Sequence, residues 1–261
     1  NIIKQIHNGD FLQTNFTRKY YSYCNYFLLG DLFLKLSKKS NVFYSSFIKH
    51  DNDFVLCFSP ERFLKKNNNN ITTSPIKGTF KNSQNLDKKI VIDNLLNQKN
   101  KSENLMITDL MRNDLSKICK IGTVQTDLFI TDLYKNIAHL SSDVSGILLD
   151  NLSVFETINS CLPIGSMTGA PKTIATNVAA QYEKTTRGIY SGFIGYFCLN
   201  SLNKNSIDFD LSVNIRCLLI SKNKFQLQAG GAITAKSKPD EELLEIKSKL
   251  GFFSKILKFE I

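Results

Sequence analysis

The sequence lacks a long apolar run. Its longest uncharged stretch, residues 188–203, is too short and too rich in glycine, serine and asparagine to span a bilayer. It also lacks an arginine-rich arm and a basic stripe interleaved with aromatic residues, so nucleic-acid binding is not indicated. We see no secretory signal peptide. We therefore expect a cytoplasmic protein that binds neither nucleic acid nor a membrane.

Paired cysteines are also absent. The six cysteines stand singly, and no two of them have the spacing of a metal site or a redox motif. Most of them lie in apolar segments, so we expect buried free thiols in a reducing cytosol. These residues are Cys24, Cys57, Cys119, Cys161, Cys198 and Cys217.

Length and composition set the scale of the fold. The 261 residues, 42% of them hydrophobic, suffice for one large domain or two small ones. The net charge is +10, with lysine and asparagine spread along the whole chain. By itself this charge is compatible with nucleic acid, an anionic membrane surface, an anionic small substrate, or a compositional bias without function.

One lysine stands on a tightly specified turn. Pro75 fixes one backbone φ angle, Gly78 permits a positive one, and Lys77 lies between them. Glu61 stands on an earlier turn, residues 59–63, which follows an apolar strand. A rigid lysine facing a carboxylate is a candidate nucleophile with an acid partner. The alternative is a solvated lysine beside a surface salt bridge.

The middle of the chain predicts helices separated by a glycine-rich turn. Residues 87–118 have the periodicity of a helix. Glu103 adjoins the apolar run of this helix. Its carboxylate either faces a bound cation or belongs to an exposed charged face. Ser153 begins a capping-box pattern that predicts a short helix ending near Ser160. The turn that follows, residues 162–172, has the small residues of an anion-binding loop or of a plain loop. Its Pro171 suits the first turn of the next helix.

The C-terminal part predicts strands and one last helix. Residues 207–219 alternate between apolar and polar positions, which predicts one strand with a buried face and a polar face that carries Arg216. Ser237 is expected to cap the last helix. On one face of that helix lie Glu242, Glu245 and Lys249. Either the two carboxylates bind a hard divalent cation and the lysine an anion, or the three residues form a solvated face.

These motifs, in this order, resemble the chorismate-binding catalytic domain shared by anthranilate synthase component I and aminodeoxychorismate synthase component I. The resemblance covers nearly the whole chain, from about residue 9 to 249. The matching blocks are SPERF (59–63), PIKGT (75–79), ENLMITDLMRNDL (103–115), HL (139–140), GSMTGAPK (165–172), RGIYSGFIGY (187–196), NIR (214–216), AGGAI (229–233) and the acidic pair with lysine on the last helix.

Within this family, lysine between Pro-Ile and Gly-Thr is typical of aminodeoxychorismate synthases, whereas anthranilate synthases usually carry alanine. The resemblance implies that Lys77 attacks C2 of chorismate, that Glu61 protonates the departing C4 hydroxyl, and that ammonia then adds at C4. His139 is implied near C4, although the residues alone favour a packed structural histidine. An anthranilate or isochorismate synthase, or a non-catalytic relic that binds a partner, remains an alternative.

The resemblance also implies a magnesium site and a substrate site. Glu103 and Glu245 are implied to hold Mg²⁺, with Glu242 acting through water. The implied contacts to chorismate are Gly78, Thr79, Tyr190, Arg216, Gly230, Gly231, Ala232 and Lys249.

The family pattern sets the expected fold and partner. It implies an α+β fold, with antiparallel sheets packed as a sandwich between flanking helices, and one catalytic domain over residues 1–261. These 261 residues do not include the N-terminal part usual in the family, so we expect no tryptophan regulation from them. We expect ammonia from a glutaminase partner, because we see no Cys-His-Glu arrangement of an ammonia-generating site. Ile164 and Ala232 depart from glycines usual in the family.

Overall fold

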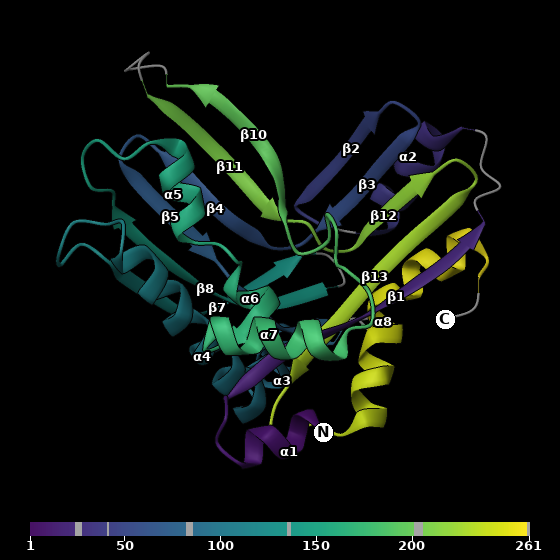
Figure 1. Cartoon of the computed structure of the whole chain (residues 1–261), viewed down its shortest axis with the longest axis horizontal. Coiled ribbons are helices and arrows are strands. Elements are labelled where there is room, and N and C mark those ends of the chain that lie inside the picture. Colours follow the sequence, from purple (N-terminus) through teal and green to yellow (C-terminus); the bar gives the residue numbers. More distant parts are fainter. Residues whose placement is uncertain (24–27, 41, 82–85, 135–136, 201–205, 260–261) are drawn as a thin grey trace. The chain divides into compact units, whose positions relative to one another are not determined.

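The computed structural model describes residues 1–23, 28–40, 42–81, 86–134, 137–200 and 206–259 (Figure 1). The chain forms two compact units, each built from discontinuous segments. Unit 1 comprises Asn1–Ser59, Ser166–Phe193 and Val213–Ile261. Unit 2 comprises Pro60–Gly165 and Ile194–Ser212.

Unit 1 contains a six-stranded sheet in which neighbouring strands are antiparallel. Its strand order is β2 (Tyr44–His50), β3 (Asp53–Ser59), β12 (Cys217–Ser221), β13 (Lys224–Ile233), β1 (Gln13–Tyr23) and β9 (Gly169–Ala170). The helices are α1 (Ile2–His7), α2 (Leu29–Ser40), the short α6 (Gly165–Thr168), α7 (Lys172–Tyr182) and α8 (Pro239–Leu257).

The core of unit 1 lies where α2 and α8 pack against the sheet. Helix α8 contacts β13, α2 contacts β3, and the two helices contact one another. The apolar stripe of α8 supplies Ile246, Leu250 and Phe253, all buried. Burial of such side chains is the main favourable term that fixes this helix on the sheet. Because one apolar stripe of α8 packs in this core, the acidic residues of α8 are held against β13.

Unit 2 contains a seven-stranded sheet. The strands run in the order β10 (Phe193–Leu199), β11 (Ile207–Val213), β4 (Arg62–Asn67), β5 (Asn70–Ser74), β8 (Ile137–Ile147) and β6 (Ile76–Lys81), and β7 (Gln125–Tyr134) also pairs with β8. Helices α3 (Lys88–Leu95) and α4 (Gln98–Ser116) contact β6 and β8, and α5 (Val154–Ser160) precedes the glycine-rich turn. The predicted α+β class with antiparallel sheets is confirmed.

Local signals at helix ends were partly right. The capping box of Ser153 is present in both directions and starts α5, which ends at Ser160 as predicted. The helix predicted over 87–118 is instead two helices, because Asn97 accepts a hydrogen bond from Asn100 and starts α4 afresh. The predicted cap at Ser237 is wrong. The hydroxyl of Ser237 donates to Glu242 Oε1 over 2.7 Å instead.

The glycine-rich turn has more regular structure than predicted. It contains α6 and the two-residue strand β9, which pairs with β1. Pro171 is the N-cap of α7 rather than a residue of its first turn. The backbone of this segment is therefore bound to the sheet of unit 1.

The strand predicted over 207–219 is interrupted. Strand β11 ends at Val213 and β12 begins at Cys217, and the two belong to different sheets. Arg216 has a φ of 49°, a left-handed value that ends extended structure. Ser212 and Asn214, on the polar face, are both buried, so that face is not simply solvated.

The cysteine prediction is largely confirmed. Cys57, Cys119, Cys161 and Cys217 are buried free thiols, and Cys198 is exposed; Cys24 lies outside the described residues. Cys57 and Cys217 face one another across β3 and β12. Among the described residues, no helix is long and apolar enough to cross a membrane.

Candidate functional site

Lys77 lies in a β-bulge and not on the short turn predicted from the sequence. In the pairing of β6 with β8, Ile76 faces Ser141 and Thr79 faces His139, so β6 carries one extra residue there. A bulge changes the direction in which a side chain points, and bulges often occur beside active sites. Gly78 makes this bulge sterically feasible: its φ is 95°, and a Cβ atom would lie 2.9 Å from Asn100 Nδ2.

Glu61 follows β3 and directly precedes β4. Its side chain is buried, with 6% of the residue exposed. Carboxylates are rarely so buried unless another group compensates their charge. The interpretation of Glu61 as part of a surface salt bridge is therefore disfavoured.

His139 is buried and hydrogen-bonded. Only 2% of the residue is exposed, and its Nδ1 atom lies 3.0 Å from the hydroxyl oxygen of Thr79. A hydrogen bond to one ring nitrogen orients the ring and selects the tautomer at the other nitrogen. Thr79 thus has a structural link to the histidine in addition to its predicted contact with chorismate.

Glu103 occupies α4, the helix that packs against β6 and β8. About a fifth of its side chain, 21%, is exposed, and its Oε1 lies 3.9 Å from the Lys99 ammonium. The next residue, Asn104, is fully buried and accepts a hydrogen bond from Ser142. Glu103 therefore borders the buried face of α4, as the sequence predicted.

In unit 1, two carboxylates and an ammonium gather over the backbone of β13. A Cβ atom at Gly231 would lie 3.1 Å from Glu242 Oε2, 3.6 Å from Glu245 Oε1 and 3.8 Å from Lys249 Nζ. Lys249 Nζ also lies 2.7 Å from Glu245 Oε1 and donates to the Gly230 carbonyl over 2.7 Å. The solvated-face alternative is therefore disfavoured, because the three charges converge on Gly231.

This arrangement fits part of a magnesium site. Mg²⁺ uses one or two protein carboxylates and completes its shell with water or substrate oxygens, and Glu242 and Glu245 supply such a pair. Among the residues that the structure describes, no group of three or more His, Cys, Asp or Glu side chains has metal-binding spacing. Glu103 belongs to unit 2, so within unit 1 the metal prediction rests on this pair.

The predicted glycine contacts have different physical origins. Gly230 is required by strand packing, because its Cβ atom would lie 2.3 Å from the Phe16 carbonyl oxygen. Gly231, in contrast, is bordered by the charged groups of α8. Ala232 pairs with Asn15 in the sheet, and Ile164 is buried in unit 2.

Tyr190 and Arg216, the predicted carboxylate-binding residues, belong to two segments of unit 1 that Asn214 joins. Tyr190 is buried, with 5% exposed. The amide group of Asn214 donates to the Ile189 carbonyl over 2.8 Å, and the Asn214 carbonyl accepts from Ser191 over 3.0 Å. Sequence reasoning did not single out Asn214, although it lies in the NIR block that contains Arg216.

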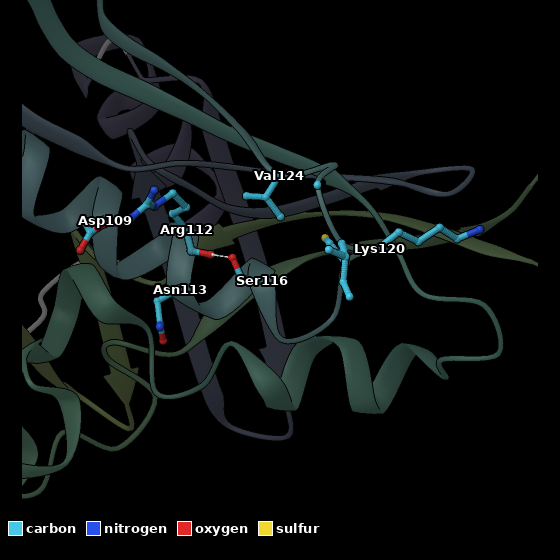
Figure 2. Close-up of a pocket in the computed structure, with 9 residues that line it drawn as sticks. Asp109, Arg112, Asn113, Ser116, Lys120 and Val124 are labelled. Atoms are coloured by element: carbon cyan, nitrogen blue, oxygen red, sulfur yellow. Dashed lines mark hydrogen bonds and ion pairs between the residues drawn. The ribbon is translucent and has the colours of Figure 1, made fainter.

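A separate cavity of about 420 Å³ lies beside the second half of α4 in unit 2 (Figure 2). None of the predicted site residues lines it. Arg112 at its edge is paired with Asp109 over 2.6 Å, and Lys120 is paired with Asp150 over 3.0 Å. Burial raises the pKa of the Cys119 thiol, which also lines the cavity, to about 11, so this thiol is a poor nucleophile.

Comparison with known proteins places these motifs in one family. The model of the chorismate binding enzyme family matches residues 1–255. The chain is 37% identical over 221 residues to a chloroplastic aminodeoxychorismate synthase of Arabidopsis thaliana, covering 82% of this chain and 23% of that protein. It is 36% identical over 258 residues to an anthranilate synthase component 1 of Buchnera aphidicola subsp. Pemphigus spyrothecae, covering 94% of this chain and 48% of that protein.

A solved structure supports the same assignment. Anthranilate synthase component I from Streptococcus pneumoniae superposes with a TM-score of 0.83 at 27% identity, covering 98% of this chain and 55% of that one. The chain thus spans less than half the length of the two curated relatives. The chain belongs to the chorismate binding enzyme family.

Proposed function

We propose that the chain converts chorismate and ammonia to 4-amino-4-deoxychorismate, as component I of an aminodeoxychorismate synthase. The observation that carries this proposal is Lys77 in the bulge of β6. In the resemblance described above, lysine at this position is typical of aminodeoxychorismate synthases and alanine of anthranilate synthases. The 37% sequence identity to a plant aminodeoxychorismate synthase over 221 residues also supports it.

In the proposed reaction, Lys77 is the nucleophile and Glu61 the acid. A bond forms between Lys77 Nζ and C2 of chorismate while the bond between C4 and its oxygen breaks. Glu61 donates a proton so that the oxygen leaves as water, because hydroxide is a poor leaving group. Ammonia then bonds to C4, the bond between Nζ and C2 breaks, and the free lysine returns. The covalent adduct divides one difficult substitution into two easier steps.

The remaining residues bind and orient the substrate in this proposal. Tyr190 and Arg216 bind the enolpyruvyl carboxylate, because a guanidinium pairs with a carboxylate through two parallel hydrogen bonds. His139, oriented by Thr79, lies near C4. Lys249 adds positive charge beside the acidic pair of α8.

Glu103, Glu242 and Glu245 are the proposed ligands for Mg²⁺. When bound, Mg²⁺ supplies positive charge that neutralises and orients the ring carboxylate of chorismate. The convergence of Glu242 and Glu245 on Gly231 supports this proposal.

We propose that ammonia comes from glutamine through a separate glutaminase subunit. Several relatives carry the name component 1, and such a name implies at least one further component. With added ammonium salt, the chain should act without the partner. With glutamine in its place, it should act only when the glutaminase is present, and activity with glutamine alone would contradict the proposal.

Product identification tests the function. The polypeptide that carries this chain is incubated with chorismate, ammonium and Mg²⁺, and the products are identified by mass. Aminodeoxychorismate retains the enolpyruvyl group, whereas anthranilate has lost it. We expect aminodeoxychorismate, and we expect Lys77→Ala to lower its formation by at least about a thousandfold. Lys88→Ala, at an exposed lysine at the start of α3, is the matched control.

Anthranilate synthesis is the second candidate. It is favoured by the match to the Buchnera protein, which covers 94% of this chain at 36% identity. If anthranilate is the main product, the aminodeoxychorismate proposal is wrong. If aminodeoxychorismate forms at an unchanged rate in Lys77→Ala, the covalent role of Lys77 is wrong.

A further inference from the structure

Arg187 connects four segments of unit 1 through one guanidinium group. Its Nε and one terminal nitrogen bind both carboxylate oxygens of Glu183, over 2.9 and 2.7 Å. It also donates to the Met167 carbonyl over 2.6 Å, to the Asn15 carbonyl over 2.7 Å and to the Ser191 hydroxyl over 3.3 Å. A planar guanidinium is suited to such simultaneous contacts, and a lysine cannot reproduce them.

The Arg187–Glu183 ion pair is shielded from solvent. The exposed fraction of the side chain is 18% for Arg187 and 4% for Glu183. Glu183 also accepts a hydrogen bond from the Thr17 backbone nitrogen over 2.8 Å. Both charges are thus satisfied by fixed groups, the condition under which a buried ion pair is tolerated.

The turn that begins at Arg187 carries Tyr190. The Tyr190 backbone nitrogen donates to the Arg187 carbonyl over 3.2 Å. Asn214 binds the other side of the turn, where its backbone nitrogen donates to the Gly192 carbonyl over 2.7 Å. Arg187 contacts the hydroxyl of Ser191, and Asn214 accepts from the Ser191 backbone. The tyrosine is therefore held between two independent attachments.

Both attachments restrain unusual backbone. Ser191 has a φ of 70° and Arg216 a φ of 49°. Non-glycine residues seldom adopt such left-handed values and keep them only where surrounding contacts fix them. The contacts of Arg187 and Asn214 are of this kind.

We propose that Arg187, together with Glu183, is a positioning residue for the carboxylate-binding part of the substrate site. The pair fixes the turn of residues 187–192, and thereby Tyr190, against the sheet of unit 1. This inference rests on the proposed role of Tyr190 in binding the enolpyruvyl carboxylate. Arg187 itself does not contact the substrate in this proposal.

The first test separates substrate binding from chemistry. In Arg187→Lys, we expect the KM for chorismate to rise about tenfold while kcat changes less than about twofold, because binding geometry and not the reacting groups is altered. Hydrogen exchange at the Ser191 amide should become about tenfold faster, with the amides of β13 unchanged. Asp208→Asn, which weakens a shielded ion pair with Lys66 in unit 2, is the matched control and should change neither.

A double variant separates positioning from stability. Glu183→Gln alone leaves the Arg187 charge buried without a counter-charge, which is destabilising. Glu183→Gln with Arg187→Gln removes both charges and should recover much of the lost stability. The bonds from Arg187 to Asn15 and Met167 are still lost, so the KM should remain high. If the KM recovers together with the melting temperature, the pair is only structural and the proposal is wrong.

The hydrogen-exchange result does not depend on the proposed reaction. If the polypeptide makes no aminodeoxychorismate but exchange at Ser191 accelerates in Arg187→Lys, the proposed function fails while the restraint on the turn stands. Chorismate binding measured by calorimetry then reports on the site directly. Unchanged exchange at Ser191, or unchanged chorismate affinity, would overturn the proposal.

Discussion

The Nδ1 atom of His139 lies 3.0 Å from the Thr79 hydroxyl oxygen, and the two residues face one another across β6 and β8. Thr79 directly follows the bulge that carries Lys77 and Gly78. One strand thus presents the lysine and orients the histidine. A change at Thr79 is therefore expected to affect chemistry more than stability.

Thr79→Val removes the hydroxyl and keeps the shape of the side chain. We expect kcat/KM for chorismate to fall about tenfold, because the imidazole loses its oriented tautomer. Steady-state kinetics of product formation measure this effect. Thr126→Val, the same change at an exposed position of β7, is the control and should have little effect. Wild-type kinetics in Thr79→Val would show that this hydrogen bond has no part in catalysis.

Gly231→Ala should weaken magnesium activation. The new methyl group would lie 3.1 Å from Glu242 Oε2 and 3.6 Å from Glu245 Oε1, so at least one carboxylate must move. We expect the Mg²⁺ concentration for half-maximal activity to rise about tenfold, equivalent to about 1.4 kcal/mol of binding energy. Titration of activity with MgCl₂ measures this change.

Gly251→Ala is the control for that experiment. A Cβ atom at Gly251 would meet nothing within 4 Å, and the residue lies inside α8. Replacing a glycine inside a helix by alanine stabilises by about 0.5–1 kcal/mol. We expect a higher melting temperature and an unchanged response to Mg²⁺. If both glycine variants respond to Mg²⁺ as the wild type does, the acidic pair is not the metal site.

Lys249→Met should reduce affinity for chorismate. The ammonium contacts the Gly230 carbonyl and the Glu245 carboxylate, and methionine keeps much of the side-chain volume but no charge. We expect the KM for chorismate to rise about tenfold, because one cation is lost beside an anionic substrate. Lys247→Met, two residues earlier on an exposed part of α8, controls for the charge of the whole chain. If the two variants raise the KM for chorismate equally, Lys249 acts only through the net charge of the chain and has no specific role in binding chorismate.

The thiols of Cys57 and Cys217 should make the folded state sensitive to alkaline pH. Desolvation by burial raises the pKa of Cys57 to about 12. The pKa of Cys217 is also raised, mainly by desolvation on burial and secondly by the charge of the nearby Cys57 thiolate. The folded state retains protons that the unfolded thiols lose above their ordinary pKa. The stability contribution is thus fully present below about pH 8.5 and declines as the pH rises toward 12.

Urea unfolding between pH 8 and pH 10.5 measures this dependence. We expect the free energy of unfolding to fall more steeply with pH in the wild type than in the Cys57→Ala, Cys217→Ala double variant. The difference in slope should approach about 1.4 kcal/mol per pH unit for each thiol. Parallel slopes would mean that these thiols ionise with similar pKa values in the folded and unfolded states.

Much of the family assignment was determined by the sequence alone. The motif around Lys77, the acidic pair with lysine on the last helix and the capping box at Ser153 all involve residues close in the chain. Such signals depend on local backbone preferences and on the spacing of side chains along one element. Both can be read directly from the sequence. For this reason the short helix α5 was predicted correctly, and the α+β class followed from the family that the ordered motifs resemble.

Long-range pairing was decided only by the tertiary structure. Cys57 and Cys217 are far apart in the sequence, yet strand register places them opposite one another. Arg187 reaches the Asn15 carbonyl, a group that carries no side-chain signature. The break near Arg216 likewise depends on tertiary structure, because β11 and β12 belong to different sheets although the alternating pattern of the sequence is continuous. The sequence thus determined which chemical groups the protein has, while packing of distant strands decided which of them meet.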